Sequence, residues 1–395
     1  MLHTLSVVLL ALGILGFLLL LVQLSSAARH LRATPPEPKT LPPISILKPL
    51  CGVDDDLERN LAAFVSLDYP DYEVVLGVRD TSDAAYALAR AFVRRHPGRV
   101  RLVVQRGTPG LNPKVNQLCT LARAARHELL VVSDSNVRVE GDYLREIAAW
   151  FDDPRVGAVT HPIAGVGEVR LGAAMDNMYM TGNIATGMIA AKRVGGKPLV
   201  VGKSMAMRRA DVDALGGFGA AADVLAEDYY FGSRVQRVLG KTVAVAHRPV
   251  YNVTTQRSVK DFVARYQRWS VMHRQAIGVP LYTGELLLNP LVLVAAAALC
   301  APTGPALTLL APACALKMAI DAGATRLLCA KRPSVKHVVA VPLKDALIAY
   351  AWLHGLCART IDWRGNRLRV GPGTVILPAL TASNEVEESR NSAVA

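Results

Sequence analysis

Three signatures of common nucleotide and metal sites are missing from the 395 residues. The six cysteines include no Cys-x-x-Cys pair and three lie in apolar segments, so we expect free, buried thiols and no zinc site. After the first predicted strand the chain reads "ISILKPLCGVDDD", without the Gly-x-Gly-x-x-Gly turn of dinucleotide-binding folds. Residues 195–204, "GGKPLVVGKS", resemble a P-loop, but its first glycine would have to stand at Lys197. We therefore expect neither an NAD enzyme nor a P-loop kinase, and interpret this stretch as a glycine-bearing loop leading into a strand.

Acidic residues are fewer than basic ones. The chain has 45 Lys and Arg against 32 Asp and Glu, a net charge of +13 at pH 7. Such a balance favours an anionic partner, and nucleic acid, anionic lipid and phosphorylated substrates all fit. The mean hydropathy of +0.27 is high for a soluble protein and points to membrane segments.

An uncharged apolar run, residues 5–24, lies near the N-terminus and is long enough to cross a bilayer as a helix. A cleaved signal peptide is the alternative, because residues 25–28 are small. However, no Lys or Arg precedes the run, the run is long for a signal peptide, and Arg29, Arg32 and Lys39 follow it. We therefore expect an uncleaved anchor, with residues 29 onward in the cytoplasm.

Three weaker apolar runs occupy the C-terminal third, at residues 286–301, 303–322 and 338–357. All three contain proline, and the last two carry four charged residues, Lys317, Asp321, Lys344 and Asp345. Such charges must pair, snorkel or face protein if these segments lie in a membrane. Full, interfacial and re-entrant placements stay open, because four full spans would put the basic tail outside, against the positive-inside tendency.

Between these regions, apolar strand patterns alternate with helix patterns. Strands are predicted at residues 44–47, 72–78, 99–104 and 128–134, and helices at 55–66 after Asp54, at 83–96, and at 113–126 after the cap Asn112. This alternation predicts an α/β domain with a mostly parallel sheet covered on both faces.

Acidic side chains follow two of the predicted strands. Asp80 and Asp83 come after the second strand, and "LLVVSDSN" places Asp134 and Asn136 at the end of the fourth. The carboxyl ends of parallel strands share one edge of a sheet, where ligands bind. Asp134 and Asn136 offer oxygen ligands that suit Mg²⁺ or Mn²⁺. Taken alone, the four polar residues at positions 133–136 are better explained by an ordinary turn.

Two later segments can likewise be explained either as parts of a functional site or as ordinary structure. Glu227 and Asp228 begin a predicted helix, where acidic residues also simply favour the helix dipole. "RYQRW" (265–269) concentrates Arg265, Arg268 and Trp269, although a basic amphipathic helix on a membrane would show this composition too.

The order of these motifs resembles glycosyltransferases of the GT-A fold that carry a D, D, D, (Q/R)xxRW signature. Asp83, Asp134 and Asp228 match the three acids, and residues 265–269 match the RxxRW box. The stretches "ISILKPLCGVD", "LDYPDYEVVLGVRD", "LNPKVNQL", "SDSNVRV" and "AEDYYF" narrow the resemblance to the ceramide glucosyltransferase family (family 21). The bacterial hopanoid-biosynthesis glycosyltransferases are similar as well, in "LKPLCG" and in Trp363-Arg364-Gly365. The animal ceramide enzymes carry a His-Pro pair in the segment that matches residues 178–187, and this chain does not.

The resemblance implies inverting transfer of glucose from UDP-glucose to the primary hydroxyl of ceramide. Asp228 would be the base, Asp83 with Asp80 as its companion would contact the nucleoside, and Lys114 and Asn116 would help to bind the donor. Asp134 and Asn136 would hold a divalent cation, Mg²⁺ or Mn²⁺, on the diphosphate. Arg265 and Arg268 would pair with phosphate oxygens, and Trp269 would close the acceptor side.

The implied organisation is a Rossmann-like GT-A domain with membrane segments at both ends. Its parts are an anchor at 1–28, a Pro-rich linker at 29–43, the GT-A domain at 44–280, membrane-embedded or interfacial helices at 281–362, and a basic then polar tail at 363–395 whose end we expect to be disordered. The expected partners are a UDP-sugar, a lipid acceptor and the bilayer, without nucleic acid, and the expected location is a bacterial inner membrane.

Three alternatives stay open at the sequence level. One is a hopanoid-lipid glycosyltransferase that uses UDP-N-acetylglucosamine. The second is a processive polysaccharide synthase, which shares the RxxRW box but usually has more spanning helices. The third is a non-enzymatic, anion-binding membrane scaffold, against which the intact Asp134, Asp228 and Arg268 argue.

Overall fold

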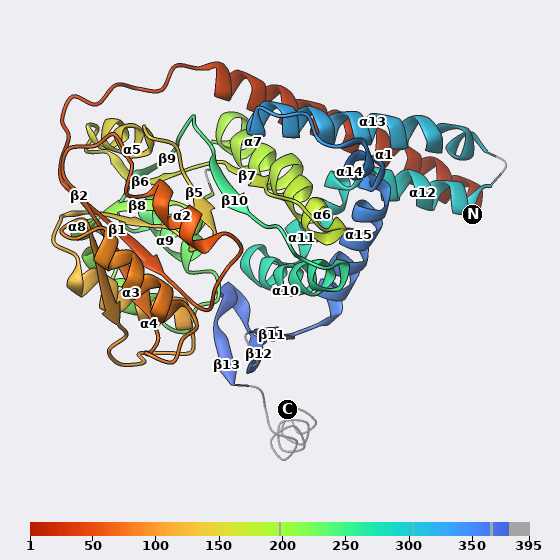
Figure 1. Cartoon of the computed structure of the whole chain (residues 1–395). Helices are drawn as coiled ribbons and strands as arrows, with labels where there is room; N and C mark the ends of the chain where they lie inside the picture. Colours follow the sequence, from red (N-terminus) through yellow and green to blue (C-terminus); the bar gives the residue numbers. More distant parts are fainter. Residues whose placement is uncertain (197–198, 303, 364–365, 379–395) are drawn as a thin grey trace, which may run out of the picture.

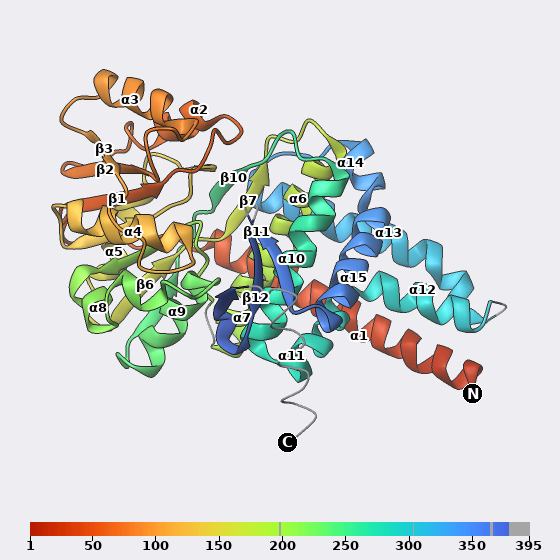
Figure 2. The same ribbon diagram turned by 90° about the horizontal axis from the view of Figure 1, so that it is seen from below.

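A computed structural model describes residues 1–196, 199–302, 304–363 and 366–378 of the chain. Figures 1 and 2 show a domain built on a twisted sheet, from which a group of long helices extends to one side.

Within these residues, seven strands form the central sheet in the order β3-β2-β1-β4-β8-β6-β9. Their bounds are β1 Ile44–Pro49, β2 Tyr72–Val78, β3 Val100–Val104, β4 Leu129–Val132, β6 Val156–Thr160, β8 Met205–Arg208 and β9 Thr242–Val245. The first four are mutually parallel, and β8 runs antiparallel to its neighbours. The predicted, mostly parallel α/β sheet is therefore confirmed.

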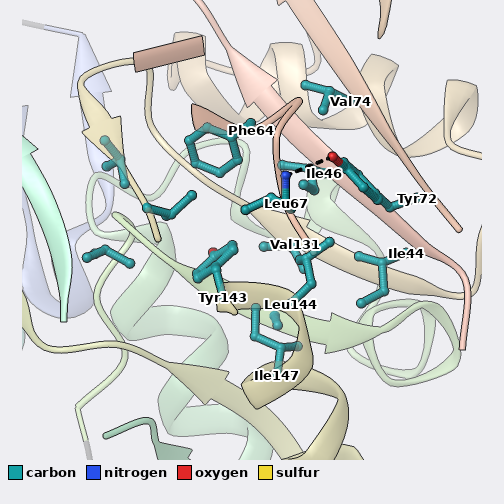
Figure 3. Close-up of a cluster of buried hydrophobic side chains, with 14 of the residues drawn as sticks. Ile44, Ile46, Phe64, Leu67, Tyr72, Val74, Val131, Tyr143, Leu144 and Ile147 are labelled. Atoms are coloured by element: carbon teal, nitrogen blue, oxygen red, sulfur yellow. Dashed lines mark hydrogen bonds between the residues drawn. The ribbon is translucent and has the colours of Figure 1, made fainter. Parts of the chain in front are cut away.

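Successive side chains of each strand enter two separate cores, because strand side chains alternate between the faces of a sheet. Ile44 and Ile46 pack on one face with α2 (Leu57–Ala63), α3 (Ala85–Arg95) and α5 (Tyr143–Phe151). Leu47 packs on the other face with α4 (Pro113–Ala124), α8 (Arg209–Ala214) and α9 (Glu227–Arg237). Figure 3 shows the first core, where the backbone N–H of Leu67 donates to the Tyr72 hydroxyl at 3.2 Å.

Two of the predicted helix starts hold and one is wrong. Asn112 caps α4 by accepting from the backbone N–H groups of Lys114 and Val115. Asp54 does not cap a helix, because its carboxylate accepts from the Ser135 hydroxyl. Helix α2 starts later, at Leu57, and follows Asp56, whose backbone is in the left-handed conformation. Glu227 and Asp228 open α9 as predicted.

A smaller sheet and the helix of the RxxRW box complete the domain. The sheet has the order β5-β10-β7, with β5 at Val137–Arg138, β7 at Ile163–Val166 and β10 at Val250–Val253. The chain then passes through α6 (Leu171–Tyr179), the π-helix η1 (Met180–Ala185), α7 (Thr186–Gly195) and the short η2 (Phe218–Ala221). The RxxRW box lies on α10 (Val259–Ile277), which α11 (Val279–Gly284) and η3 (Glu285–Leu288) follow.

Two helices of the described chain are long and apolar enough to cross a membrane, α1 (Leu2–Arg32) and α13 (Pro305–Cys329). A third crossing is possible only if the segment before α12 (Pro290–Cys300) and α12 itself count as one span, and they are bent by 83°. Residues 338–357 are not among the candidate spans of the described chain, because Ala340 separates α14 (Val335–Val339) from α15 (Val341–Cys357). In α15, Lys344 and Asp345 are buried and pair with each other at 2.8 Å and with Lys317 and Asp321 of α13.

The stretch predicted as a tail begins with ordered structure. Strands β11 (Thr360–Trp363), β12 (Asn366–Val370) and β13 (Ile376–Pro378) form a three-stranded sheet, with η4 (Pro372–Thr374) in between. This strand pattern was not predicted, and the expected disorder of the end concerns residues 379–395, outside the described residues.

The cysteines differ in part from the expectation. All six are free, but Cys51 and Cys357 are exposed and the others are only partly buried. The prediction of buried thiols is therefore wrong.

Candidate active site

Asp134 lies directly beyond β4 and is flanked by two lysines. Its two carboxylate oxygens are 2.8 Å from Nζ of Lys114 and 2.9 Å from Nζ of Lys203. Burial would raise the pKa of Asp134, but the two ammonium groups outweigh it and hold this pKa well below its usual range. The carboxylate is consequently charged at any physiological pH.

Lys114 joins Asp134 to the acids of α9. Because Asn112 fixes the start of α4, the Lys114 side chain extends over the sheet edge, where its Nζ is also 2.7 Å from Glu227. Burial disfavours the charged amine, yet Asp134 and Glu227 overcome it and raise the pKa of Lys114. Elements that are far apart in the sequence thus meet at one ammonium group.

Asp228 is buried next to Glu227 and is held by two backbone N–H groups. Its carboxylate accepts from the backbone N–H groups of Gly202 at 2.6 Å and Tyr229 at 2.8 Å. Burial and the neighbouring Glu227 raise the pKa of Asp228 to about 6, against the opposing effect of Lys114. A carboxyl group with this pKa exchanges protons near neutral pH, which general acid–base catalysis requires.

Gly202 provides the space for this cluster. A Cβ atom at this position would lie 2.8 Å from Lys114 Nζ and 3.2 Å from the Asp228 carboxylate. The P-loop-like stretch therefore contributes a glycine to the site, although it leads into strand β8 and not into a helix, as expected.

Lys203 and Lys48 also contact Asp134, and neither was predicted from the sequence. Lys203 also donates to the Asn136 side-chain oxygen at 2.8 Å, and burial lowers the pKa of this lysine. Lys48 is fully buried in β1, donates to the Asp134 backbone oxygen at 2.8 Å, and stands 3.6 Å from the Phe64 ring centroid. A charged residue inside an otherwise apolar strand was the available signal for Lys48.

The start of β8 is held by a second buried network. Ser204, next to Lys203, shares hydrogen bonds with His161 Nδ1 at 2.8 Å and with the Tyr143 hydroxyl at 2.7 Å. Burial lowers the pKa of His161 to about 4, so the ring is neutral at physiological pH. This network fixes the backbone that carries Gly202 and Lys203.

The residues predicted to hold a metal do converge. One carboxylate oxygen of Asp134 and the side-chain oxygen of Asn136 both contact Lys203, so two hard oxygen atoms face one buried cation. No three His, Cys, Asp or Glu side chains cluster as metal ligands in the described part of the chain. The oxygens nevertheless fit a hard divalent cation, since the ammonium groups already stand beside them and such ions often take further ligands from substrate phosphates.

Asp83 and Asp80 lie on loops at the same edge, after β2. Asp83 accepts from the backbone N–H groups of Gly52 at 2.9 Å and Ala85 at 2.8 Å, which ties the loop after β1 to α3. Asp80 is more exposed and bonds to Ser82, whose hydrogen bonds lower the pKa of Asp80. Neither forms an ion pair with the Asp134 cluster in the described residues.

Asn116 lies apart from the Asp134 cluster. Its side-chain amide donates to the Gly110 oxygen at 2.7 Å and its oxygen accepts from the Gly110 N–H at 3.1 Å. Asn116 therefore closes the loop before α4, whereas Lys114 from the same motif reaches the cluster.

The RxxRW residues project from α10, and Asp176 of α6 holds one of them. Asp176 is fully buried, and its carboxylate accepts from Arg257 and the Tyr266 hydroxyl at 2.8 Å each and lies 3.5 Å from Arg265 Nε. The Arg265 guanidinium also stacks over the Trp269 ring, 4.4 Å from its centroid. Burial opposes the charge of Arg265, but Asp176, Tyr266 and then Asp134 raise its pKa. Arg268 is one turn further along the same helix, half-buried.

The C-terminal strands brace the segment before Asp228. Leu225 N donates to the Thr374 oxygen at 2.9 Å, and Ile376 N donates to the Asp223 oxygen at 2.7 Å. The side chain of Leu225 packs with Val271 of α10 and Ile376 of β13. The tail thus links the start of α9 to α10.

Fold and site together define a GT-A-type glycosyltransferase domain with membrane helices. A family model described as glycosyl transferase family 21 matches residues 8–376, so the chain belongs to that family. The chain is 28% identical over 245 residues to ceramide glucosyltransferase 1 of Caenorhabditis elegans, covering 59% of this chain and 50% of the relative. It is 28% identical over 236 residues to the ceramide glucosyltransferase of Komagataella phaffii, covering 51% of this chain and 46% of the relative. The aligned part thus spans about half the length of each of these relatives.

A solved structure supports the fold. A mannosyltransferase of Pyrobaculum calidifontis, determined with GDP-Man and Mn²⁺, has a TM-score of 0.56 at 22% identity. The match covers 89% of this chain and 99% of that one.

Proposed function

We propose that this protein is a membrane-bound inverting glycosyltransferase that transfers glucose from UDP-glucose to the primary hydroxyl of ceramide. The observation that carries this proposal is the cluster in which Lys114 contacts both Asp134 and Glu227, beside Asp228, in a chain of family 21. The similarity to ceramide glucosyltransferases supports this donor and this acceptor.

The basic residues around Asp134 would receive the diphosphate. Lys114 and Lys203 bring two positive charges next to the Asp134 carboxylate, and Arg265 adds a third from α10. Phosphate oxygens would attract these cations and offset the charge that grows on departing UDP. Asp134 and Asn136 would hold a divalent cation, which when bound supplies Lewis-acid stabilisation of the leaving group.

Asp228 would take the acceptor proton. Its pKa of about 6 leaves it mostly ionised at neutral pH, so it can accept the hydroxyl proton as the oxygen attacks the anomeric carbon. The backbone N–H groups of Gly202 and Tyr229 fix its orientation.

The remaining predicted residues would complete the two substrate sites. Asp83, with Asp80, would contact the nucleoside beyond β2. Arg268 would assist Arg265 at the diphosphate, and Trp269, stacked on Arg265, would close the acceptor side.

The membrane helices would bring the domain to its lipid substrate. A two-tailed acceptor stays in the bilayer, so the site must lie at the bilayer surface. The basic residues Arg29 and Arg32 at the end of α1 favour a domain on the cytoplasmic side, and the membrane we propose is a bacterial inner membrane.

The test is expression of the full chain with ceramide and each UDP-sugar, followed by lipid extraction and mass spectrometry. Hexosylceramide formed from UDP-glucose, and absent with Asp228→Asn, is the expected result. A sugar on a hopanoid would identify the other acceptor, and a polymer would identify a synthase. Absence of any transfer by well-folded protein would reject the enzymatic proposal.

A further inference from the structure

A groove lies where α13 meets α14, and no candidate active-site residue lines it. It has a volume of about 400 Å³. The apolar part of its lining comes from both helices: Met318, Ala322 and Gly323 on α13, and Val335, Val338 and Val339 on α14. Such a concave apolar surface is suited to a hydrocarbon chain.

Two arginines add positive charge to this lining. Arg326 is in the last turn of α13 and Arg332 follows in the connection to α14. Neither has an acidic partner among the described residues, whereas the neighbouring Lys331 pairs with Glu168 at 3.1 Å. The groove thus combines an apolar wall with two uncompensated guanidinium groups, which bind phosphate oxygens well.

The groove lies at the level expected for lipid headgroups. Helices α13 and α1 run side by side in the same direction, because Ala306 packs near Leu9 whereas Gly323 faces Leu24. Arg326 is therefore at the same end of the pair as the basic residues that end α1. Within the lining of the groove, Val335 and Val339 of α14 are 78% and 60% exposed, as on a surface that dips into a membrane.

We propose that this groove binds an acidic phospholipid. One acyl chain would lie along the apolar wall, and the headgroup phosphate would pair with Arg326 and Arg332. An acidic headgroup is favoured over a zwitterionic one because the two arginines leave a net positive charge that a choline group would oppose. This lipid site is separate from the glycosyl acceptor and needs no sugar transfer.

The experiment is native mass spectrometry of the detergent-solubilised full chain, titrated with phosphatidylglycerol or with phosphatidylcholine of the same acyl chains. The chain should bind phosphatidylglycerol more tightly. Arg326→Gln with Arg332→Gln should weaken phosphatidylglycerol binding by roughly tenfold, because each basic residue near an anionic headgroup contributes several-fold, and should leave phosphatidylcholine binding unchanged. Ala322→Phe, which fills the apolar wall, should weaken the binding of both lipids.

The matched control is Arg90→Gln with Arg94→Gln, which removes the same charge from two exposed arginines of α3. This variant should bind phosphatidylglycerol as the unaltered chain does. Equal loss in both double variants, equal affinity of the unaltered chain for the two lipids, or unchanged binding without Arg326 and Arg332 would each overturn the proposal. If the double variant fails to fold, the single variants replace it, each with a several-fold loss expected.

Discussion

At the residue scale, the site is a set of charges whose protonation depends on their neighbours. Asp134 stays ionised because two lysines flank it, whereas the pKa of Asp228 rises to about 6 because it is buried beside Glu227. Two carboxylates in one site thus suit different tasks, one binding cations and the other accepting a proton.

The raised pKa of Asp228 predicts an acid limb in the pH profile. Below pH 6 the carboxyl group is protonated and cannot accept the acceptor proton, so kcat/KM should rise with pH and level off above about 6. Asp228→Asn should abolish this limb and lower kcat by roughly 10²- to 10⁴-fold, with UDP-glucose affinity near that of the unaltered chain. Kinetics across pH together with calorimetric donor titration measure both effects. Substantial residual turnover by the variant would eliminate Asp228 as the base.

Asp134→Ala should weaken metal-dependent donor binding. Removal of the carboxylate takes away the proposed cation ligand and the shared partner of Lys114 and Lys203, so the Kd for UDP-glucose with Mn²⁺ should rise at least about tenfold. Asp68→Ala, at an exposed carboxylate paired with Arg145, is the control and should bind normally. Nucleotide affinity that stays unchanged in Asp134→Ala with metal present would refute the assigned role.

The sequence identified some of these residues and missed others for a definite reason. Asp134 and Asp228 stand in recognisable motifs at a strand end and a helix start. Lys203 stood in a rejected P-loop pattern, and only the antiparallel return of β8 beside β4 brings it to Asp134. Lys48 was not predicted as a site residue, because it lies in a mostly apolar strand and local patterns do not show what a buried charge contacts.

At the element scale, α10 is positioned by a neighbour that no motif marked. Asp176 on α6 contacts Arg257, Arg265 and Tyr266, from the connection before α10 and from the helix itself. Removal of one partner from a buried ion pair costs about 3–5 kcal/mol, because the other charge is left uncompensated.

Asp176→Asn should therefore lower both stability and turnover. We expect a reduced unfolding temperature and a fall in kcat of about tenfold or more, since Arg265 loses the buried carboxylate that holds it in place. A purely structural role would leave kcat per folded molecule unchanged, and that result would exclude positioning of Arg265. Asp213→Asn, at an exposed acid of α8, is the control and should change neither quantity appreciably.

At the scale of the whole molecule, the membrane helices and the catalytic domain form one continuous structure. The side chain of His30, near the end of α1, bonds to the Ala246 oxygen at 2.9 Å and stacks on His247, so the anchor is docked on the domain. The linker then returns along the surface, where Lys39 N donates to Asp152 at 2.6 Å.

The proposed cytoplasmic orientation of the catalytic domain can be tested in membrane vesicles. If the domain faces the cytoplasm, a protease added to inverted membrane vesicles should cut the exposed loop at residues 106–111, and right-side-out vesicles should protect it. Immunoblotting with terminal tags measures the cleavage. The reverse pattern would overturn the cytoplasmic orientation.

The sequence by itself determined the parallel α/β core, the apolar helix near the N-terminus and the principal acidic residues, because periodicity, capping and motif order are local properties. Only the tertiary structure decided how the charged residues of the C-terminal helices are paired. Lys317 and Asp321 of α13 form ion pairs with Asp345 and Lys344 of α15, and the sequence of either helix alone does not show this pairing. The contacts of Asp176 and of the lysines beside Asp134 also depend on the tertiary structure, since a buried charge is stabilised by partners that only folding brings within a few ångströms.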